Sequence, residues 1–227
     1  RGKKVIGVKW VDIDKGDPGS PAIRSRLVAK ELRAFAPWIP QEDLFAATPP
    51  TAALNLLLST MVSRKSRAGQ PYKLAFLDVR RAFFYAAATE EVYVELAPED
   101  RVAGQDLVGL LHRSMYGTRS ASKNWQLQLG RDLAALGFKQ AKSSPGIFWH
   151  EELDARLVIH GDDLWLLADE KSLAALMPKL HSAHELKVDG ILGPDAEDEK
   201  AVRSLNKLLR FVPGVGIEIE ADPRHAE

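Results

Sequence analysis

The chain has 227 residues, 45% of them hydrophobic, and equal numbers of acidic and basic side chains, so its formal charge at pH 7 is zero. This apolar content is enough for a folded core and excludes a chain that is disordered throughout. Cysteine is absent, which excludes disulfides and thiolate metal sites.

The start of the chain bears on where the protein works. The first ten residues, RGKKVIGVKW, begin with arginine rather than methionine and lack the apolar core of a secretory signal peptide. No apolar run approaches the roughly 20 residues of a membrane span. We therefore expect a piece of a longer intracellular chain, from a cytoplasmic particle or the nucleus, that is neither secreted nor bound to a membrane.

Charge is distributed unevenly along the sequence. Residues 1–35 and 101–150 each carry a net charge of +5, whereas residues 151–227 carry −8. Two basic blocks are suited to binding a polyanion such as nucleic acid. Ordinary scatter of surface charge explains the same numbers, so charge alone does not decide.

Apolar spacing and turn signals divide the first half of the chain into strands and one clear helix. The expected elements are a strand at 4–13, a turn at 15–21, a strand at 22–29, a loop at 36–50, a helix at 52–63, a strand at 72–79, a short helix or turn at 80–88 and a strand at 91–96. The first two strands and their turn predict a hairpin with a basic return arm.

The second half mixes helices with short strands. The expected elements are a helix at 120–137, a strand at 146–150, a strand–turn–strand at 155–169, a helix at 170–186 that breaks at Pro178, an acidic loop at 189–200, a helix at 201–211 and a strand at 215–221. The order lacks the steady βαβ rhythm of a parallel sheet, which indicates an α+β fold.

Two adjacent acids lie between two apolar runs in RLVIHGDDLWLLAD, residues 156–169. This pattern predicts a hairpin with Asp162 and Asp163 at its tight turn. Aspartate is also an ordinary turn residue, so a turn that only exposes two acids to solvent explains the pattern as well.

A third acid, Asp78, ends the apolar strand YKLAFLDV. If the two strands pair in one sheet, three carboxylates crowd one edge, and cations must offset their repulsion. Oxygen ligands favour Mg²⁺ or Mn²⁺. Two such ions about 3.5–4 Å apart serve phosphoryl and nucleotidyl transfer.

Five segments resemble, in order and spacing, the reverse transcriptases of copia-type LTR retrotransposons. They are RSRLVAKELRAFAP, YKLAFLDVRRAFFYAAATEEVYVELAPED, LLHRSMYGTRSASKNWQLQL, LGFKQAKSSPGIF and LVIHGDDLWLLAD. The resemblance extends from about residue 5 to about residue 190. It implies an α+β fold with fingers and palm, in which an antiparallel palm sheet packs on helices.

The resemblance also implies a domain organisation. Residues 1–70 would form a fingers-like segment, and residues 71–190 a palm that carries the catalytic carboxylates, with a fingers insertion at about 100–130. Residues 191–227 would supply the acidic loop and the start of a thumb or connection, for which the helix expected at 201–211 is the candidate.

The same resemblance assigns roles to the acids. Asp78 and Asp162 match the two aspartates that bind both catalytic metals, and Asp163 matches the second turn acid, which lies beside the primer end. His160 and Gly161 stand where the family has an aromatic and an apolar residue, and we expect them to contact the primer.

Nucleotide-binding roles follow in the same way. Phe83 resembles the aromatic that stacks under the incoming sugar and rejects a 2′-OH, although a core phenylalanine at the start of a helix fits the pattern equally well. Arg26 resembles the fingers cation that meets the triphosphate, with Arg24 and Lys30 as neighbouring candidates.

The segment SMYGTRSAS supplies the last candidates. Tyr116, Gly117 and Arg119 resemble the loop that packs on the nucleotide and template, and glycine would permit a close backbone approach. A turn that leads into a helix is the alternative. Trp125 is expected in the core of that helix rather than as a platform for bases.

The expected function is RNA-directed DNA polymerisation by a domain of a retrotransposon polyprotein. It would use two Mg²⁺ or Mn²⁺ ions, deoxynucleotides and a primer on an RNA or DNA template, and would work with the RNase H and integrase parts of the polyprotein. One alternative is an inactive or domesticated copy that at most binds nucleic acid. Another is a metal-dependent phosphohydrolase built on the same acids.

Overall fold

The computed structural model describes residues 5–14, 16, 19–31, 46 and 48–220, which form two compact units. The first unit consists of residues 1–46 and 81–128, and the second of residues 47–80 and 129–227. The loop expected at 36–50 lies largely outside the described residues. No helix in the described part of the chain is long and apolar enough to cross a membrane.

The second unit is built on an antiparallel six-stranded sheet with the strand order β11-β4-β10-β9-β8-β7. Its strands are β4 (Lys73–Val79), β7 (Lys139–Gln140), β8 (Ile147–His150), β9 (Ala155–His160), β10 (Asp163–Ala168) and β11 (Leu186–Leu192). Strands β4 and β10 are buried over most of their length because helices cover both faces of the sheet, which explains their continuous apolar runs.

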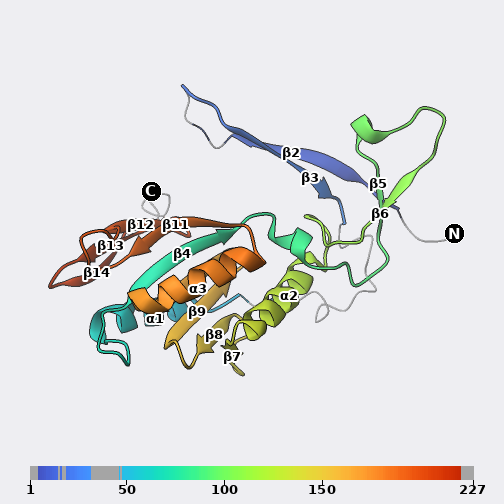
Figure 1. The fold of residues 1–227 in the computed structure, drawn as a ribbon. Helices are drawn as coiled ribbons and strands as arrows, with labels where there is room; N and C mark the ends of the chain where they lie inside the picture. Colours follow the sequence, from blue (N-terminus) through green and yellow to red (C-terminus); the bar gives the residue numbers. More distant parts are fainter. Residues whose placement is uncertain (1–4, 15, 17–18, 32–45, 47, 221–227) are drawn as a thin grey trace. The chain divides into compact units, whose positions relative to one another are not determined.

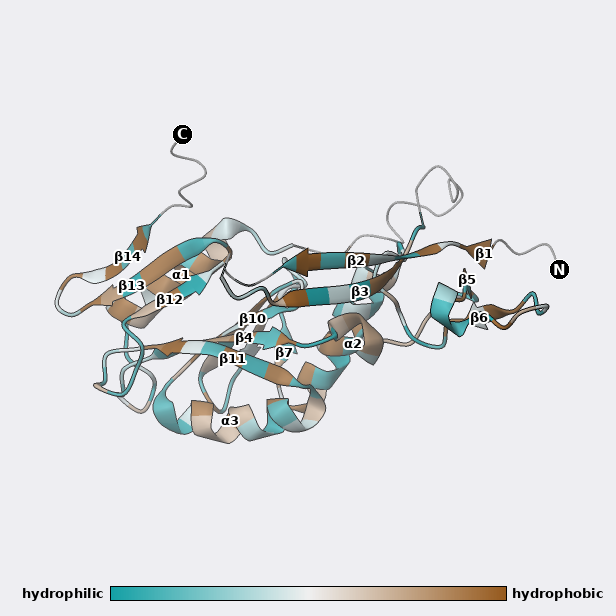
Figure 2. Ribbon diagram, turned by 90° about the horizontal axis from the view of Figure 1, so that it is seen from above, coloured by the Kyte–Doolittle hydropathy of each residue, from teal (hydrophilic) through white to brown (hydrophobic). Residues whose placement is uncertain are grey.

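Two helices lie on opposite faces of this sheet, as Figures 1 and 2 show. The first, α1 (Thr51–Ser63), buries Leu54, Leu57 and Met61 against a sheet face that carries Phe76 and Trp165. The second, α3 (Glu170–Ala183), covers the other face, and its leucines are among the most deeply buried side chains. An antiparallel sheet packed on helices is the fold expected from the sequence.

Helix α3 continues through the proline at which a break was expected, so that expectation was wrong. Pro178 lies inside α3, which runs unbroken to Ala183. Asp169 caps its start by accepting a hydrogen bond from the Ser172 N–H at 2.9 Å. Burial of Leu176 and Leu180 on the sheet offsets the backbone hydrogen bond that proline cannot make.

The segment expected as a helix at 201–211 is a β-hairpin, so the candidate for the start of a helical thumb is absent there. Strands β12 (Ala201–Ser204), β13 (Lys207–Val212) and β14 (Gly216–Glu220) form an antiparallel three-stranded sheet. Leu205 and Asn206 make the turn between β12 and β13, both with positive φ. Val202 and Leu209 pair across the strands and are buried with α1.

The acidic segment at 189–200 is a strand followed by a loop that neutralises a buried lysine. Residues 189–192 belong to β11, which corrects the expectation of a loop there. The Lys73 ammonium is buried and lies 2.6 Å from the Glu170 carboxylate, 2.9 Å from Asp195 and 2.7 Å from Asp198. These neighbours raise the pKa of Lys73, although its burial opposes them. The loop thereby fastens β4 to the start of α3.

The first unit contains two small sheets. Its strands are β1 (Val5–Ile6), β2 (Val8–Asp14), β3 (Ile23–Ala29), β5 (Tyr93–Glu95) and β6 (Val108–Leu110), with 3₁₀ turns η3 (Ala82–Tyr85) and η4 (Pro98–Asp100). The hairpin expected from the N-terminal sequence is β2–β3, and the residues before Gly7 form β1, which pairs with β5 instead. Helix α2 (Ala121–Ala135) begins in residues of the first unit and ends in residues of the second. The side chain of Trp125 on this helix is buried, as expected.

The division into units differs from the domain boundary expected at residue 70. The chain leaves the first unit at Ala46, and α1 belongs to the second unit because its apolar face is buried on the six-stranded sheet. Residues 81–99, expected in the palm, belong with the N-terminal hairpin. A helix belongs to the unit against which it packs its apolar face, and the position of the helix along the sequence does not show which unit that is.

Candidate active site

Two of the three predicted acids are direct neighbours across adjacent strands. Asp163, the first residue of β10, is the antiparallel partner of Asp78, the penultimate residue of β4. Directly opposed residues lie on the same sheet face with Cβ atoms about 5 Å apart. The two strands therefore pair, which meets the condition under which Asp78 was expected beside the hairpin turn.

The third acid is held in the turn itself. Gly161 and Asp162 form a two-residue turn between β9 and β10, because His160 and Asp163 are paired. Gly161 has a φ of 69°, which fits glycine at the first position of a type II′ turn. The Val79 N–H donates to the Asp162 carbonyl at 2.9 Å, and this bond fixes the turn beside the end of β4.

The electrostatics of this edge identify a fourth carboxylate. Burial, followed by the charges of Asp162, Asp78 and Asp189, raises the pKa of Asp163 to about 7. Strand pairing places Asp78, Asp163 and the Asp162 turn at one edge of the sheet, and Asp189 lies two residues beyond Lys187, the partner of Asp78 on β11. A strongly perturbed acid in such a cluster is typical of functional sites.

The donor set suits a hard divalent cation. Carboxylate oxygens are the ligands that Mg²⁺ and Mn²⁺ prefer. As the side chains stand, however, no group of three or more His, Asp or Glu residues in the described part of the chain is gathered closely enough to hold a metal ion. The carboxylates are thus neighbours by backbone position rather than a finished ligand cage. Assignment of Asp78 and Asp162 as metal ligands stays a prediction.

His160 extends the row of the two paired acids across the sheet. It is the antiparallel partner of Asp163 on β9, and its ring stacks on Trp165 with centroids 5.9 Å apart and planes at 23°. The Trp165 indole N–H in turn donates to the Ser204 hydroxyl at 3.0 Å. The imidazole is thereby held beside the acids, while its expected contact with a primer stays a prediction.

Three of the residues predicted to bind the nucleotide come together in the first unit. The Tyr116 ring lies 4.6 Å from the Phe83 ring, measured between centroids, and the Arg26 guanidinium carbon lies 5.2 Å from the Tyr116 centroid. Residues from three separate segments therefore form one partly exposed cluster of two aromatic rings and a cation.

The loop that carries Tyr116 is fastened to β3 through its backbone. The Ala29 N–H donates to the Tyr116 carbonyl at 2.8 Å, and the Arg119 N–H donates to the Glu31 carboxylate at 2.7 Å. Gly117 has a φ of 84°, and a Cβ there would lie 1.9 Å from the Ala29 carbonyl oxygen. Only glycine fits this close approach.

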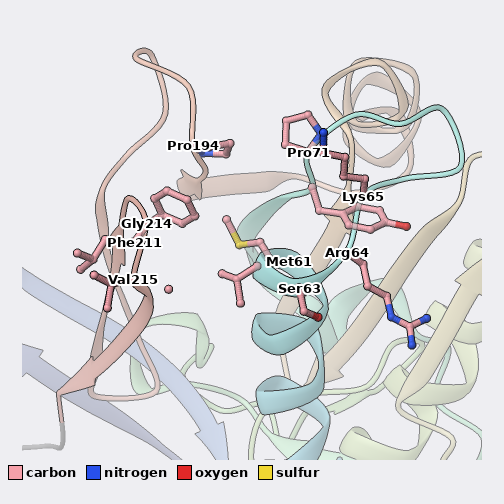
Figure 3. Close-up of a pocket in the computed structure, with 13 residues that line it drawn as sticks. Met61, Ser63, Arg64, Lys65, Pro71, Pro194, Phe211, Gly214 and Val215 are labelled. Carbon is pink, nitrogen blue, oxygen red and sulfur yellow. The ribbon is translucent and has the colours of Figure 1, made fainter.

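A pocket elsewhere in the second unit is separate from the acids. Its volume is about 500 Å³, and it lies between the end of α1 and the β13–β14 hairpin, as Figure 3 shows. Phe211 and Val215 line it on the hairpin side, and Met61, Arg64 and Lys65 line it at the end of α1. None of the predicted site residues lines this pocket.

Sequence reasoning missed Asp189 and its neighbour Lys187. Asp189 was assigned to an acidic loop and Lys187 to no element, whereas both lie on β11, where Lys187 is the partner of Asp78. The alternation of LKVDGIL is a weak strand signal, and no feature of the sequence reveals which strand it joins.

Comparisons with known proteins match the chain to one family. A family model described as "Reverse transcriptase (RNA-dependent DNA polymerase)" matches residues 1–192. The chain is 26% identical over 216 residues, 90% of its length, to the "Retrovirus-related Pol polyprotein from transposon TNT 1-94" of Nicotiana tabacum. It is 26% identical over 150 residues, 63% of its length, to the "Retrovirus-related Pol polyprotein from transposon RE2" of Arabidopsis thaliana. It spans 16% and 10% of these polyproteins.

Among solved structures, the chain is similar to telomerase from Candida albicans, solved in complex with the TWJ fragment of telomeric RNA. The TM-score is 0.47 at 10% sequence identity, and the match covers 96% of this chain and 47% of that one. The resemblance to copia-type reverse transcriptases is confirmed by the family model and the transposon polyproteins. With residues 1–192 of 227 matched, the chain belongs to the reverse transcriptase (RNA-dependent DNA polymerase) family.

Proposed function

We propose that this chain is the polymerase part of a retrotransposon polyprotein and joins deoxynucleotides to the 3′-OH of a primer on an RNA or DNA template. The observation that carries the proposal is the pairing of Asp78 with Asp163 beside the turn that holds Asp162. A carboxylate at the end of a buried strand is held more rigidly than one on a loop, as a metal ligand must be.

The chain's own residues have distinct parts in this chemistry. Asp78 and Asp162 would hold two divalent cations, Mg²⁺ or Mn²⁺, and Asp163 and His160 would lie at the primer end. When bound, the cations lower the pKa of the attacking hydroxyl and offset the charge of the departing pyrophosphate. Burial and the neighbouring carboxylates raise the pKa of Asp163, which supports this reading because a bound cation would offset both effects.

The aromatic cluster of the first unit would handle the nucleotide. Arg26 would pair with the triphosphate through its planar guanidinium, and Phe83 would lie under the sugar. Tyr116 supports both, since it contacts the Phe83 ring and the Arg26 guanidinium. Gly117 and Arg119 would keep this loop against the nucleotide and template.

The related polyproteins are much longer than this chain. The chain spans 16% of the tobacco relative, and we expect RNase H and integrase parts to act with it on the same template. A single part of such a protein would bind duplex weakly and lose that binding as salt rises.

Primer extension tests the proposal. The protein is incubated with an oligo(A) template, an oligo(dT) primer, dTTP and Mg²⁺ or Mn²⁺, and compared with Asp162→Asn and Asp78→Asn. Each substitution should lower the extension rate by at least about 100-fold, because a charged group at the reacting centre is lost. Asp106→Asn, which removes an exposed carboxylate from the first unit, should leave the rate unchanged.

The competing reading is a folded copy that binds nucleic acid without catalysis. It predicts no extension by the wild-type chain and equal duplex affinity for the wild-type chain and Asp162→Asn. Phosphate release from a small ester without a primer would instead favour a phosphohydrolase.

A further inference from the structure

A lysine lies beside the predicted metal ligand on the opposite side from Asp163. Lys187 on β11 is the antiparallel partner of Asp78 on β4, just as Asp163 on β10 is its partner on the other flank. Directly opposed residues share a sheet face. The side chains of Lys187, Asp78 and Asp163 therefore follow one another across three strands, at the edge where Asp162 forms the turn.

An irregularity in β11 brings a further acid to the same place. The register between β11 and β4 shifts between Val188 and Gly190, and Asp189 has no partner on β4. An extra residue of this kind redirects its side chain, and such bulges are frequent next to active sites. The Asp189 carboxylate contacts the ammonium of Lys187, the residue that faces Asp78 across the strands, so it lies near the same edge.

The lysine and this acid form an ion pair of their own. The Lys187 ammonium nitrogen lies 2.5 Å from the Asp189 carboxylate, and both side chains are partly exposed. An exposed pair of this kind contributes little to stability. Its position matters more, because it adds one positive and one negative charge beside carboxylates that would bind a divalent cation.

We propose that the Lys187–Asp189 pair sets the divalent-cation affinity of the Asp78–Asp162 site. The inference rests on the proposed function, since it needs a cation at these carboxylates. Lys187 repels the cation and Asp189 attracts it, and together they leave the net charge of the edge unchanged. Both are positioning residues that act through the field at Asp78 rather than by touching the substrate.

Mn²⁺ binding provides a test that does not depend on activity. The electron paramagnetic resonance signal of free Mn²⁺ is titrated with the wild-type chain, Lys187→Met, Asp189→Asn and the double variant. Lys187→Met should tighten Mn²⁺ binding and Asp189→Asn should weaken it, each on the order of threefold to tenfold for one unit charge at this range. The double variant should return close to the wild-type affinity.

Two controls separate this effect from general surface charge and from misfolding. Lys139 and Glu151 form an exposed pair of the same 2.5 Å length at the other end of the sheet, where β7 lies. Lys139→Met and Glu151→Gln should not change Mn²⁺ affinity. Thermal melting of each variant confirms that it is folded.

The outcomes distinguish this inference from the proposed function. If Asp162→Asn binds Mn²⁺ as tightly as the wild-type chain does, the metal site itself is refuted, and the inference with it. If Asp162→Asn loses Mn²⁺ but Lys187→Met and Asp189→Asn bind it with wild-type affinity, the inference alone is overturned. Opposite shifts that cancel in the double variant support it, since a purely structural ion pair would not produce them.

Discussion

A buried lysine and a partly buried aspartate in the second unit show how surroundings decide the role of a residue. Lys73 lies among three carboxylates that neutralise it, so it serves the fold by joining β4, α3 and the acidic loop. Asp163 lies among like charges, which raise its pKa to about 7 together with burial. A strongly perturbed acid of this kind is typical of functional sites, and the cation binding proposed above would offset its cost.

His184 is a buried titratable residue with no part in the proposed reaction. It ends α3, and its Nε2 lies 3.2 Å from the Asp132 carboxylate. Burial lowers the pKa of His184 below its usual 6.5, and Asp132 only partly opposes this shift. Its partner Asp132 lies on α2 and is partly buried, so His184 joins two helices and is a structural residue.

The lowered pKa of His184 predicts a loss of stability in acid. As pH falls through 6.5, the unfolded state takes up a proton that the folded state still resists, so the free energy of unfolding decreases. His184→Gln removes this linkage, and its melting temperature should fall less than that of the wild-type chain between pH 7.5 and 5.5. In a protein of this size, about 1 kcal/mol corresponds to about 2–4 °C.

Asp163 provides an internal check on this measurement. Its raised pKa acts in the opposite direction, since the folded state gains protons as pH falls below about 7. That contribution is common to both proteins, and the difference between their melting curves therefore isolates His184. Equal losses on acidification would show that His184 titrates alike in the folded and unfolded states.

At the scale of elements, the sequence predicts best where local pattern and packing agree. The hairpin at 155–169 was predicted from the two apolar runs that flank a tight turn. Only Asp162 of the two acids expected in that turn lies there, because the turn is Gly161–Asp162 and Asp163 begins β10. The pairing of β4 with β10 could only be stated as a condition, since no local signal says which strands meet. The bulge that redirects Asp189 was beyond prediction for the same reason.

The segment AVRSLNKLLRF shows how a pattern misleads. Its apolar residues at 202, 205, 208 and 209 fit a helical stripe, but Leu205 forms the turn and is 38% exposed. Val202 and Leu209 instead alternate inward on two strands and are buried against α1. The burial of Val202 and Leu209 in the tertiary structure therefore decided the conformation, against the helical spacing of the four apolar residues.

The turn between β12 and β13 predicts an unusual gain in stability. Leu205 has a φ of 47°, which costs a leucine roughly 1–2 kcal/mol. Asparagine tolerates this conformation, so Leu205→Asn should raise the free energy of unfolding in urea by about 1 kcal/mol. Leu205→Ala is the matched control, because alanine is no better suited to positive φ and should give no gain. In a helix the order would reverse, with alanine stabilising relative to asparagine.

At the scale of the whole molecule, the two units differ in charge. The first unit contains 14 basic and 12 acidic side chains, and the second 17 basic and 19 acidic. The first unit includes the exposed Arg24 and Lys30 at the two ends of the β3 segment, and the second includes the four acids of the candidate site. This distribution suits an arrangement in which basic residues of the first unit bind backbone phosphates and the acids of the second unit would bind cations.

The salt dependence of duplex binding tests whether basic residues of the first unit bind phosphates. Fluorescence anisotropy of a labelled primer–template is measured between 50 and 200 mM KCl, a range in which each phosphate contact contributes about −0.9 to the slope of log K against log salt. Arg24→Gln and Lys30→Gln should each make the slope shallower by about that amount. Lys171→Gln and Lys179→Gln remove exposed charges from α3 and should leave it unchanged. Equal effects of all four substitutions would mean that the basic blocks are ordinary surface charge, because binding through net charge alone does not depend on which lysine or arginine is lost.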